Sequence, residues 1–183
     1  MSLPPLAVAA LAFLVERPMH PYEMYSLMLK RREDRVVKVS AGTLYRAVEK
    51  LRDSGLAEEV GVDRAGNRPE RTTYRATEQG REQLGAAIEE MLAAPAEEYP
   101  QFPLALSQAT LLPATVVSRL LGERETVLRR ELALLAEGER KVRSLQLPES
   151  RWLDIGYRRA MLLAQLDWLT ATRRRIAADE VAW

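Results

Sequence analysis

Donor side chains recur along one side of a predicted helix that begins after Ser40. Thr43, Arg46 and Lys50 stand at i, i+3 and i+7, which brings them onto one stripe of the helix surface. The apolar positions that would face a core are Leu44, Val48 and Leu51. A hydroxyl, a guanidinium and an ammonium on one stripe suit the base edges and phosphates of a DNA major groove. The alternative is an ordinary solvated helix face, since Lys and Arg are common surface residues.

Positive charge is concentrated around that helix. Residues 30–75 carry twelve Lys and Arg and eight Asp and Glu, a net charge of +4, whereas the whole chain is only +1. Arg64, Arg68 and Arg71 lie at the tip of a predicted hairpin and could follow a DNA backbone or enter a minor groove. A solubilising loop is the alternative for this tip. The near-neutral total charge names no partner by itself.

The composition excludes several kinds of site. The chain has no cysteine and one histidine, His20, which excludes a disulfide framework, a thiolate metal site and a multi-histidine metal site. No Gly-rich phosphate loop, nucleophile elbow or metal-spaced cluster is present in the sequence. We therefore expect no enzyme, no metal and no cofactor. His20 stands at a predicted helix start, where capping or a backbone contact is expected rather than a catalytic or pH-sensing role.

The apolar run Leu6–Val15 is the segment that comes nearest to a targeting sequence. Its ten residues are half of the ~20 needed to span a bilayer, and no Lys or Arg precedes it. A buried helix is the better interpretation, and the lack of cysteine suits a reducing compartment. We therefore expect a cytoplasmic protein that makes no membrane contact.

The order of predicted elements in the first half of the chain points to a fold. The patterns predict helices over 5–16, 20–32 and 41–54, strands over 56–62 and 71–76, and a helix capped by Thr77 whose apolar stripe is Leu84, Ile88 and Leu92. Three helices followed by a hairpin are typical of a winged helix-turn-helix. We assign residues 1–94 to such a DNA-binding domain.

The second half is predicted to be a linker followed by two long helices. Pro95, Pro100 and Pro103 break helices and strands, so residues 95–112 are predicted to be a proline-containing linker. One helix is predicted from Pro113 to about Gln146 and another after Pro148. Apolar residues seven apart mark both, namely Leu121, Leu128, Leu135 and Val142, then Ile155, Leu162, Leu169 and Ile176.

Two helices alone cannot bury both of their apolar faces, so a second copy of the chain is the expected cover for these rows. We assign residues 113–183 to a helical-hairpin domain for dimerisation and, as a further expectation, effector binding. The predicted fold class is therefore mainly α, with an N-terminal winged helix-turn-helix and an all-helical C-terminal dimerisation domain.

Four short motifs in order make the N-terminal half resemble the PadR family of bacterial transcription regulators. They are His20-Pro21-Tyr22-Glu23, Ser40-Ala41-Gly42-Thr43-Leu44-Tyr45, Leu51 through Gly55-Leu56, and Arg71-Thr72-Thr73-Tyr74-Arg75-Ala76-Thr77 with Gly80. Together they span roughly residues 5 to 85. The C-terminal half is similar in pattern, and in the segment Phe102-Pro103-Leu104-Ala105-Leu106-Ser107, to the helical dimerisation region of larger PadR-like proteins.

The resemblance implies a homodimeric winged-helix regulator, usually a repressor, that binds an inverted-repeat operator and releases it when a small molecule binds. It places Ser40, Thr43, Tyr45 and Tyr22 at the DNA surface. With the residues chosen above, the expected DNA contacts are Tyr22, Lys38, Ser40, Thr43, Tyr45, Arg46, Lys50, Arg64, Arg68 and Arg71. Family members commonly have glycine in place of Pro21, and a proline there fits the first turn of a helix without strain. They commonly have proline in place of Arg46, which adds a long cation to the reading face, so operator preference cannot be transferred to this chain.

Trp152 and Trp168 are the expected effector contacts, because some PadR-like regulators hold planar aromatic ligands with tryptophans near the dimer interface. A small aromatic or hydrophobic effector would suit them, and plain packing in a helical interface is the alternative. A second function also stays open, a winged-helix adaptor that binds a partner protein without specific DNA binding.

Overall fold

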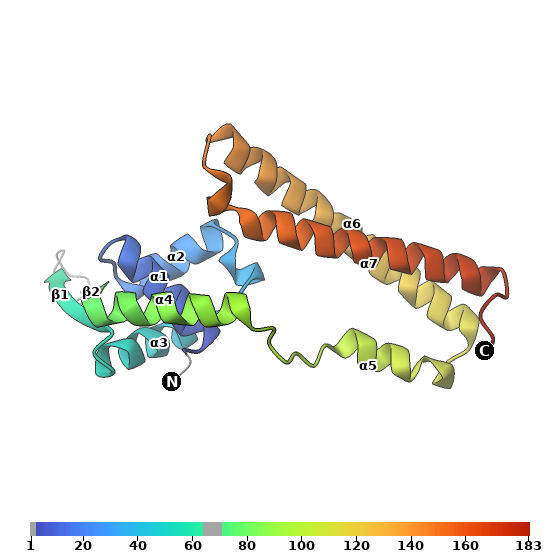
Figure 1. Ribbon diagram of the computed structural model, residues 1–183, viewed down its shortest axis with the longest axis horizontal. Helices are drawn as coiled ribbons and strands as arrows, with labels where there is room; N and C mark the ends of the chain where they lie inside the picture. Colours follow the sequence, from blue (N-terminus) through green and yellow to red (C-terminus); the bar gives the residue numbers. More distant parts are fainter. Residues whose placement is uncertain (1–2, 64–70) are drawn as a thin grey trace. The chain divides into compact units, whose positions relative to one another are not determined.

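The chain folds into two compact units. The computed structural model describes residues 3–63 and 71–183, and contacts divide the chain into Met1–Glu98 and Tyr99–Trp183 (Figure 1). The first unit contains helices and a two-stranded hairpin, and the second is built of helices in this structure. The predicted mainly α fold class is confirmed.

Local capping explains where the first helices begin. Helix α1 (Pro5–Glu16) has proline at its first position, where a missing amide hydrogen costs nothing, and Arg17-Pro18 follows its end. Helix α2 (Pro21–Lys30) is capped by His20, whose Nδ1 accepts a hydrogen bond from the amide of Tyr22 at 3.0 Å. The capping role expected for His20 is therefore confirmed. A 3-10 turn, η1 (Glu33–Arg35), leads to helix α3 (Ala41–Asp53).

The hairpin that follows α3 is attached to the first helices as well as to itself. Strands β1 (Ala57–Asp63) and β2 (Arg71–Ala76) pair antiparallel, with a register shift between Glu59 and Gly61. Met19, before α2, forms an isolated antiparallel bridge with Tyr74 of β2 through backbone hydrogen bonds of 3.0 and 3.1 Å. Because Met19 and Tyr74 are both buried, this bridge ties the wing to the core.

Helix α4 (Glu78–Ala93) follows the hairpin, and its N-terminal turns pack on the core of the first unit. Thr77 caps it by accepting a hydrogen bond from the amide of Gly80 at 3.0 Å, and its hydroxyl donates to the carbonyl of Gly55 at 2.7 Å. The predicted apolar stripe was wrong after Leu84, since Ile88 and Leu92 are 41% and 83% exposed. The buried positions are Gly80, Leu84 and Ala87, at i, i+4 and i+7, and the later turns of α4 extend past the core.

The core of the first unit is continuous. Its least exposed side chains come from α1, α2 and α3 and from the hairpin, and they include Leu11, Leu14, Met19, Met24, Met28, Leu44 and Val48, each below 2% exposure. This core fixes the side of α3 that faces inward, and so fixes the side that faces solvent.

The second unit begins with a helix where the sequence predicted a linker. Helix α5 (Gln101–Ser107) and the 3-10 turn η2 (Ala109–Leu111) lie within residues 95–112. Pro103 is tolerated because it is the third residue of α5, where the amide has no intrahelical acceptor. Phe102, Leu106 and Ala109 pack against the helices that follow, so this part of the predicted linker belongs to the second unit.

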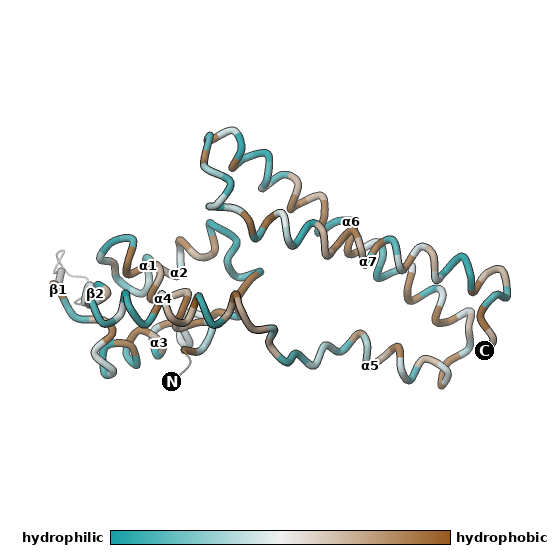
Figure 2. Tube along the Cα trace, in the orientation of Figure 1, coloured by the Kyte–Doolittle hydropathy of each residue, from teal (hydrophilic) through white to brown (hydrophobic). Residues whose placement is uncertain are grey.

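The long helices α6 (Ala114–Ser144) and α7 (Leu153–Ala177), joined through the turn η3 (Glu149–Arg151), lie side by side (Figure 2). Of the predicted seven-residue rows, Leu121, Leu128 and Leu169 are buried between the helices, and Leu162 and Ile176 pack against them. Leu135, Val142 and Ile155 are half-buried. The rows predicted to support dimerisation therefore include the residues that hold α6 to α7 within one chain.

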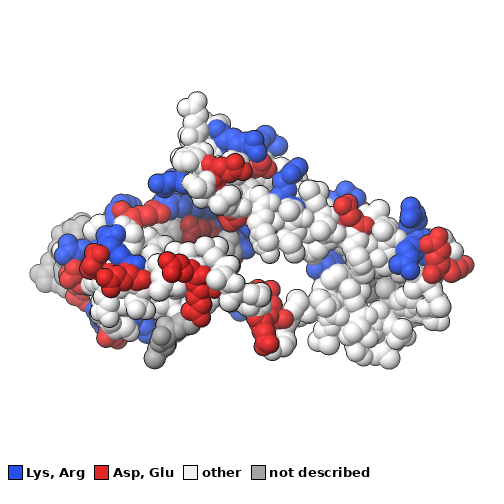
Figure 3. All heavy atoms as spheres, viewed as in Figure 1, with Lys and Arg blue, Asp and Glu red and all other residues white. Residues whose placement is uncertain are grey.

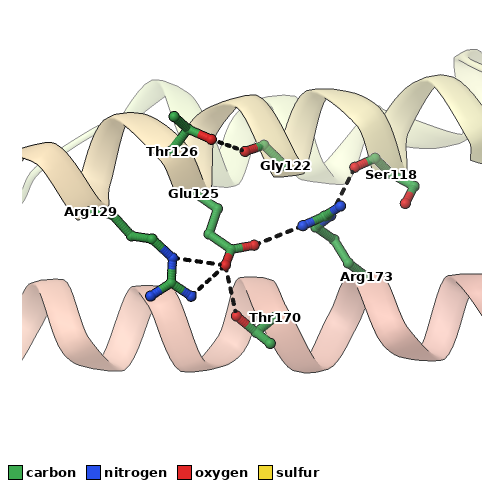
Figure 4. A network of polar contacts seen from close by, with 7 residues as sticks. All are labelled: Ser118, Gly122, Glu125, Thr126, Arg129, Thr170 and Arg173. Atoms are coloured by element: carbon green, nitrogen blue, oxygen red, sulfur yellow. Dashed lines mark hydrogen bonds and ion pairs between the residues drawn. The ribbon is translucent and has the colours of Figure 1, made fainter.

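A buried carboxylate adds a polar link to that seam (Figure 4). Glu125 accepts hydrogen bonds from Arg129 at 2.6 Å, from Thr170 at 3.3 Å and from Arg173 at 2.8 Å. The Nε of Arg173 also donates to the carbonyl of Ser118 at 3.2 Å. Arg129 and Arg173 lower the pKa of Glu125 below its ordinary value despite the opposing effect of burial. The carboxylate is thus charged at neutral pH and paired across the two helices.

Candidate nucleic-acid interface

Helix α3 presents a polar face opposite the core. Leu44, Val48 and Leu51 are its buried side, and at 100° per residue the opposite side contains Gly42, Arg46, Glu49 and Asp53, with Lys50 beside them. Arg46, Glu49 and Lys50 are exposed, and a Cβ added at Gly42 would meet no atom within 4 Å. The predicted outward position of Arg46 and Lys50 is found, and Glu49 is an outward residue that sequence reasoning missed.

The hydroxyls at the start of α3 are engaged in a cap. The Ser40 hydroxyl accepts from the amide of Thr43 at 3.2 Å, and the Thr43 hydroxyl oxygen accepts from the amide of Ser40 at 2.9 Å. Thr43 is half-buried, so its hydroxyl does not project as the stripe predicted, while Ser40 is exposed. Both residues shape the entry of α3, and direct DNA contacts by them stay predictions.

The two tyrosines predicted to contact DNA lie in the first turn of α2 and on α3 itself. Tyr22, in the first turn of α2, is 56% exposed. Tyr45 is half-buried and meets the His20 ring edge-on, with centroids 5.7 Å apart. Tyr45 also lines a concavity of about 210 Å³ together with Glu49 and the wing residues Thr72 and Tyr74. The start of α2, the face of α3 and strand β2 therefore meet at one place.

The predicted wing arginines fall at the limit of what the structure describes. Arg64 and Arg68 lie outside the described residues, and Arg71 is placed only as the first backbone position of β2. Lys38, between η1 and α3, is exposed. The roles of these four cations in DNA binding stay predictions.

Some of the basic residues counted in the sequence are neutralised by neighbours. Arg52 pairs with Asp53 at 2.7 Å and with Glu59 at 3.2 Å, and these carboxylates raise its pKa further above its ordinary value. Arg75 pairs with Glu58 across the hairpin at 2.7 Å. On the face drawn in Figure 3, basic and acidic side chains of the first unit are interspersed. Arg46 and Lys50 make no such pair within the part of the chain that is described.

The two tryptophans expected to hold an effector have different surroundings in the second unit. Trp152 is buried before α7, with its Nε1 donating to the carbonyl of Leu147 at 3.4 Å and the Arg143 guanidinium 5.0 Å from its ring. Trp168 is 45% exposed and meets the Phe102 ring edge-on, with centroids 6.1 Å apart. A shallow concavity of about 350 Å³ in this unit is lined by Arg129, Leu132, Ala133, Ala136 and Arg159, not by either tryptophan. The effector prediction stays a prediction.

The described residues offer neither a metal site nor a membrane-spanning helix. Among the described residues, no group of His, Cys, Asp and Glu side chains could hold a metal ion. No helix within these residues is long and apolar enough to cross a membrane.

Comparison with known proteins finds a family match in the first unit and similar folds over nearly the whole chain. Residues 10–86 match the Transcriptional regulator PadR-like family. The structure of Bacillus subtilis PadR in complex with operator DNA superposes with a TM-score of 0.80 at 17% identity, over 93% of this chain and 98% of that one. The structure of the same protein in complex with p-coumaric acid superposes with a TM-score of 0.79 at 17% identity, over 94% of this chain and 98% of that one. The structure of a PadR-like transcriptional regulator from Bacillus cereus superposes with a TM-score of 0.70 at 15% identity, over 95% of this chain and 99% of that one.

At these identities the likeness shows the fold over nearly the whole length of each chain. No curated protein matches the sequence significantly. The family match and the structural likeness confirm the resemblance to PadR predicted from the sequence, and this chain has the winged-helix fold of a PadR-family transcription regulator.

Proposed function

We propose that this chain is a homodimeric, DNA-binding transcription regulator that acts in the cytoplasm as a repressor. Its third helix, α3, enters the major groove of an inverted-repeat operator. The observation that carries the proposal is the solvent face of α3, where Arg46 and Lys50 are exposed beside the attached wing. Because Leu44, Val48 and Leu51 anchor α3 in the core, the helix can place this face in a major groove without changing its conformation.

The relatives support both DNA and ligand binding. Bacillus subtilis PadR, which shares the fold, has been solved with operator DNA and with p-coumaric acid. By analogy, this chain would bind an operator and a small aromatic or hydrophobic effector. Binding of the effector in the helical unit would change the distance between the two α3 helices of a dimer, and DNA affinity would fall while the reading residues stay the same.

The dimer surface we propose differs from the rows predicted from sequence, because Leu121, Leu128 and Leu169 of those rows are buried within the chain. Helix α6 carries a second seven-residue row, Leu120, Val127 and Leu134, and all three side chains are exposed. Helix α7 exposes Tyr157 and Met161. Exposed apolar rows on paired helices are typical of surfaces that a second copy covers.

Replacing Val127 by Glu tests that surface. We expect the dimer to dissociate in sedimentation velocity, because a charge would be buried in the apolar contact. Ala133→Glu is the matched control, since Ala133 is also exposed on α6 but stands on its other flank, 240° further round the helix. Dissociation by both variants, or by neither, would contradict the assignment.

Fluorescence anisotropy tests DNA binding. We expect the chain to bind a labelled fragment of its own upstream region more tightly than a scrambled fragment, with affinity that falls as salt rises. Arg46→Ala should abolish the preference, whereas Arg140→Ala, which removes the same charge from an exposed site on α6, should preserve it. Equal and weak binding to both fragments would overturn the proposal in favour of a protein-binding adaptor.

A further inference from the structure

Glu49 lies on the α3 solvent face, toward its edge near the wing. It stands three residues after Arg46 and seven after Gly42, opposite the buried side of the helix, and its side chain is exposed. It also lines the concavity shared with Tyr45, Thr72 and Tyr74, so it lies where the helix and the wing meet. Within the residues that the structure describes, no hydrogen bond or ion pair engages its carboxylate.

A carboxylate at this position is electrostatically unfavourable for general DNA binding. Phosphates line both edges of the major groove and repel a negative charge, so Glu49 opposes the attraction that Arg46 and Lys50 provide. The cation three residues further on does not compensate, because Arg52 is already paired with Asp53 and Glu59. With α3 in the major groove as proposed, Glu49 shares the solvent face of Arg46 and would reach base edges, where a carboxylate can gain a hydrogen bond instead.

The chemistry of the groove floor limits what Glu49 can bind. An ionised carboxylate only accepts hydrogen bonds, so it is repelled by the acceptor atoms of guanine and by O4 of thymine. The amino group of cytosine is the donor that suits a Glu side chain, whereas adenine places an acceptor, N7, beside its amino group. Resting on the proposed function, we propose that Glu49 is a specificity-determining residue that requires a cytosine in each operator half-site.

Selection of duplexes from a randomised pool tests this inference with the full chain. For the wild-type chain we expect an enriched inverted repeat with a cytosine at one position of each half-site. Glu49→Gln should replace cytosine by adenine at that position alone, because an amide pairs with the N6 and N7 atoms of adenine. Glu49→Ala should leave that position without preference. Glu89→Gln on α4, which removes the same charge from another exposed site, should select the wild-type sequence.

Equilibrium binding then measures the size of the effect. Replacing the selected cytosine by thymine should weaken wild-type binding at least about fivefold and should leave Glu49→Ala binding nearly unchanged. If Glu49→Gln keeps the wild-type sequence preference, and gains affinity for all duplexes as much as Glu89→Gln does, the inference is overturned while the proposed function stands. If the wild-type chain enriches no sequence, the proposed function fails and the inference fails with it.

Discussion

The two units of this chain bury their apolar residues to different extents. In the first unit, side chains from three helices and the hairpin meet in one core whose central members are almost completely buried. In the second unit, the buried apolar cluster lies at the seam between α6 and α7, with Val117, Leu121, Leu128, Leu166 and Leu169 as its members. Large apolar side chains on the outer sides of the same helices remain exposed.

This difference indicates which unit can be stable by itself. The layered core of the first unit buries its central apolar side chains without a partner, and the exposed Ile88 and Leu92 lie on the part of α4 beyond that core. A pair of helices buries apolar side chains only where the two helices meet. The exposed rows on α6 and α7 would therefore gain stabilisation from the hydrophobic effect when a partner covers them. We therefore expect the stability of the second unit, but not of the first, to rise with protein concentration.

The sequence offers a direct way to observe the units separately. All three tryptophans, Trp152, Trp168 and Trp183, belong to the second unit. Tryptophan fluorescence therefore reports on unfolding of the second unit, while far-UV circular dichroism reports on both units.

The largest expected effect comes from Gly80→Ala, which should unfold the first unit selectively. A Cβ at this position would lie 2.1 Å from the carbonyl oxygen of Leu56 and 3.3 Å from Cδ1 of Leu11, so backbone must move. We expect a loss above ~4 kcal/mol, in the range seen for severe core defects. Circular dichroism should lose one transition while the fluorescence transition stays in place.

Gly85→Ala is the matched control on the same helix. Gly85 is exposed and a Cβ there would meet nothing within 4 Å, so alanine should stabilise α4 by about 0.5–1 kcal/mol. Joint loss of both transitions in Gly80→Ala would contradict the separation into two independent cores.

A smaller effect is expected from Leu169→Ala in the seam of the second unit. Leu169 is fully buried, and truncating such a residue costs about 3 kcal/mol through lost transfer free energy and the cavity left behind. Denaturation followed by fluorescence should shift to lower denaturant, by a similar amount at every protein concentration, because the dimer surface is unchanged. Leu163→Ala, at an exposed position on the same helix, is the comparison, and an equal shift in both would argue against a seam at Leu169.

Glu125→Gln should cost about 1–3 kcal/mol at neutral pH, because it removes charge-assisted hydrogen bonds from Arg129 and Arg173. The pKa of Glu125 is lower in the folded chain than in the unfolded one, so the carboxylate stabilises the fold fully above the unfolded value. That contribution is lost as pH falls through the folded pKa. The difference between wild type and variant, measured by fluorescence, should therefore vanish in acid, and a constant difference down to pH ~3 would refute the ion-pair explanation.

The smallest effect is expected at the start of α3. Ser40→Ala removes the hydroxyl that caps Thr43, which should cost about 1 kcal/mol and change circular dichroism melting alone. Ser40→Gly should lower the free energy of unfolding by only about a few tenths of a kcal/mol, because glycine is a tolerated N-cap. If alanine and glycine behave alike, the cap does not stabilise the helix.

The sequence predicted the first unit well because its signals are local. Ser40, Thr77 and the prolines mark helix starts through backbone chemistry that needs no distant partner. It failed where tertiary packing decides. Ile88 and Leu92 continue a helical stripe, but α4 extends past the core they would face. Pro103 was read as a helix breaker although it occupies a first turn.

The candidate interface was predicted in part for the same reason. Arg46 and Lys50 follow from helical periodicity, which also shows Glu49 on the solvent side, but a search for donors overlooked an acceptor. Periodicity predicts the side of the helix on which Thr43 lies. It does not predict that its hydroxyl bonds the backbone of Ser40, because this bond depends on the extended conformation of Ser40. A seven-residue row predicts a seam but not whether its partner helix belongs to the same chain, as Leu121 and Leu128 show.

The junction of α3, β1 and α4 has a mechanical consequence. Thr77 is bonded to the carbonyls of Gly55 and Leu56, and Gly80 lies against the latter without room for a side chain. The segment that follows α3 and the first turn of α4 are therefore held together by two hydrogen bonds and a close backbone contact. We expect a displacement of α4 to move the end of α3 with it, because closely packed atoms transmit strain.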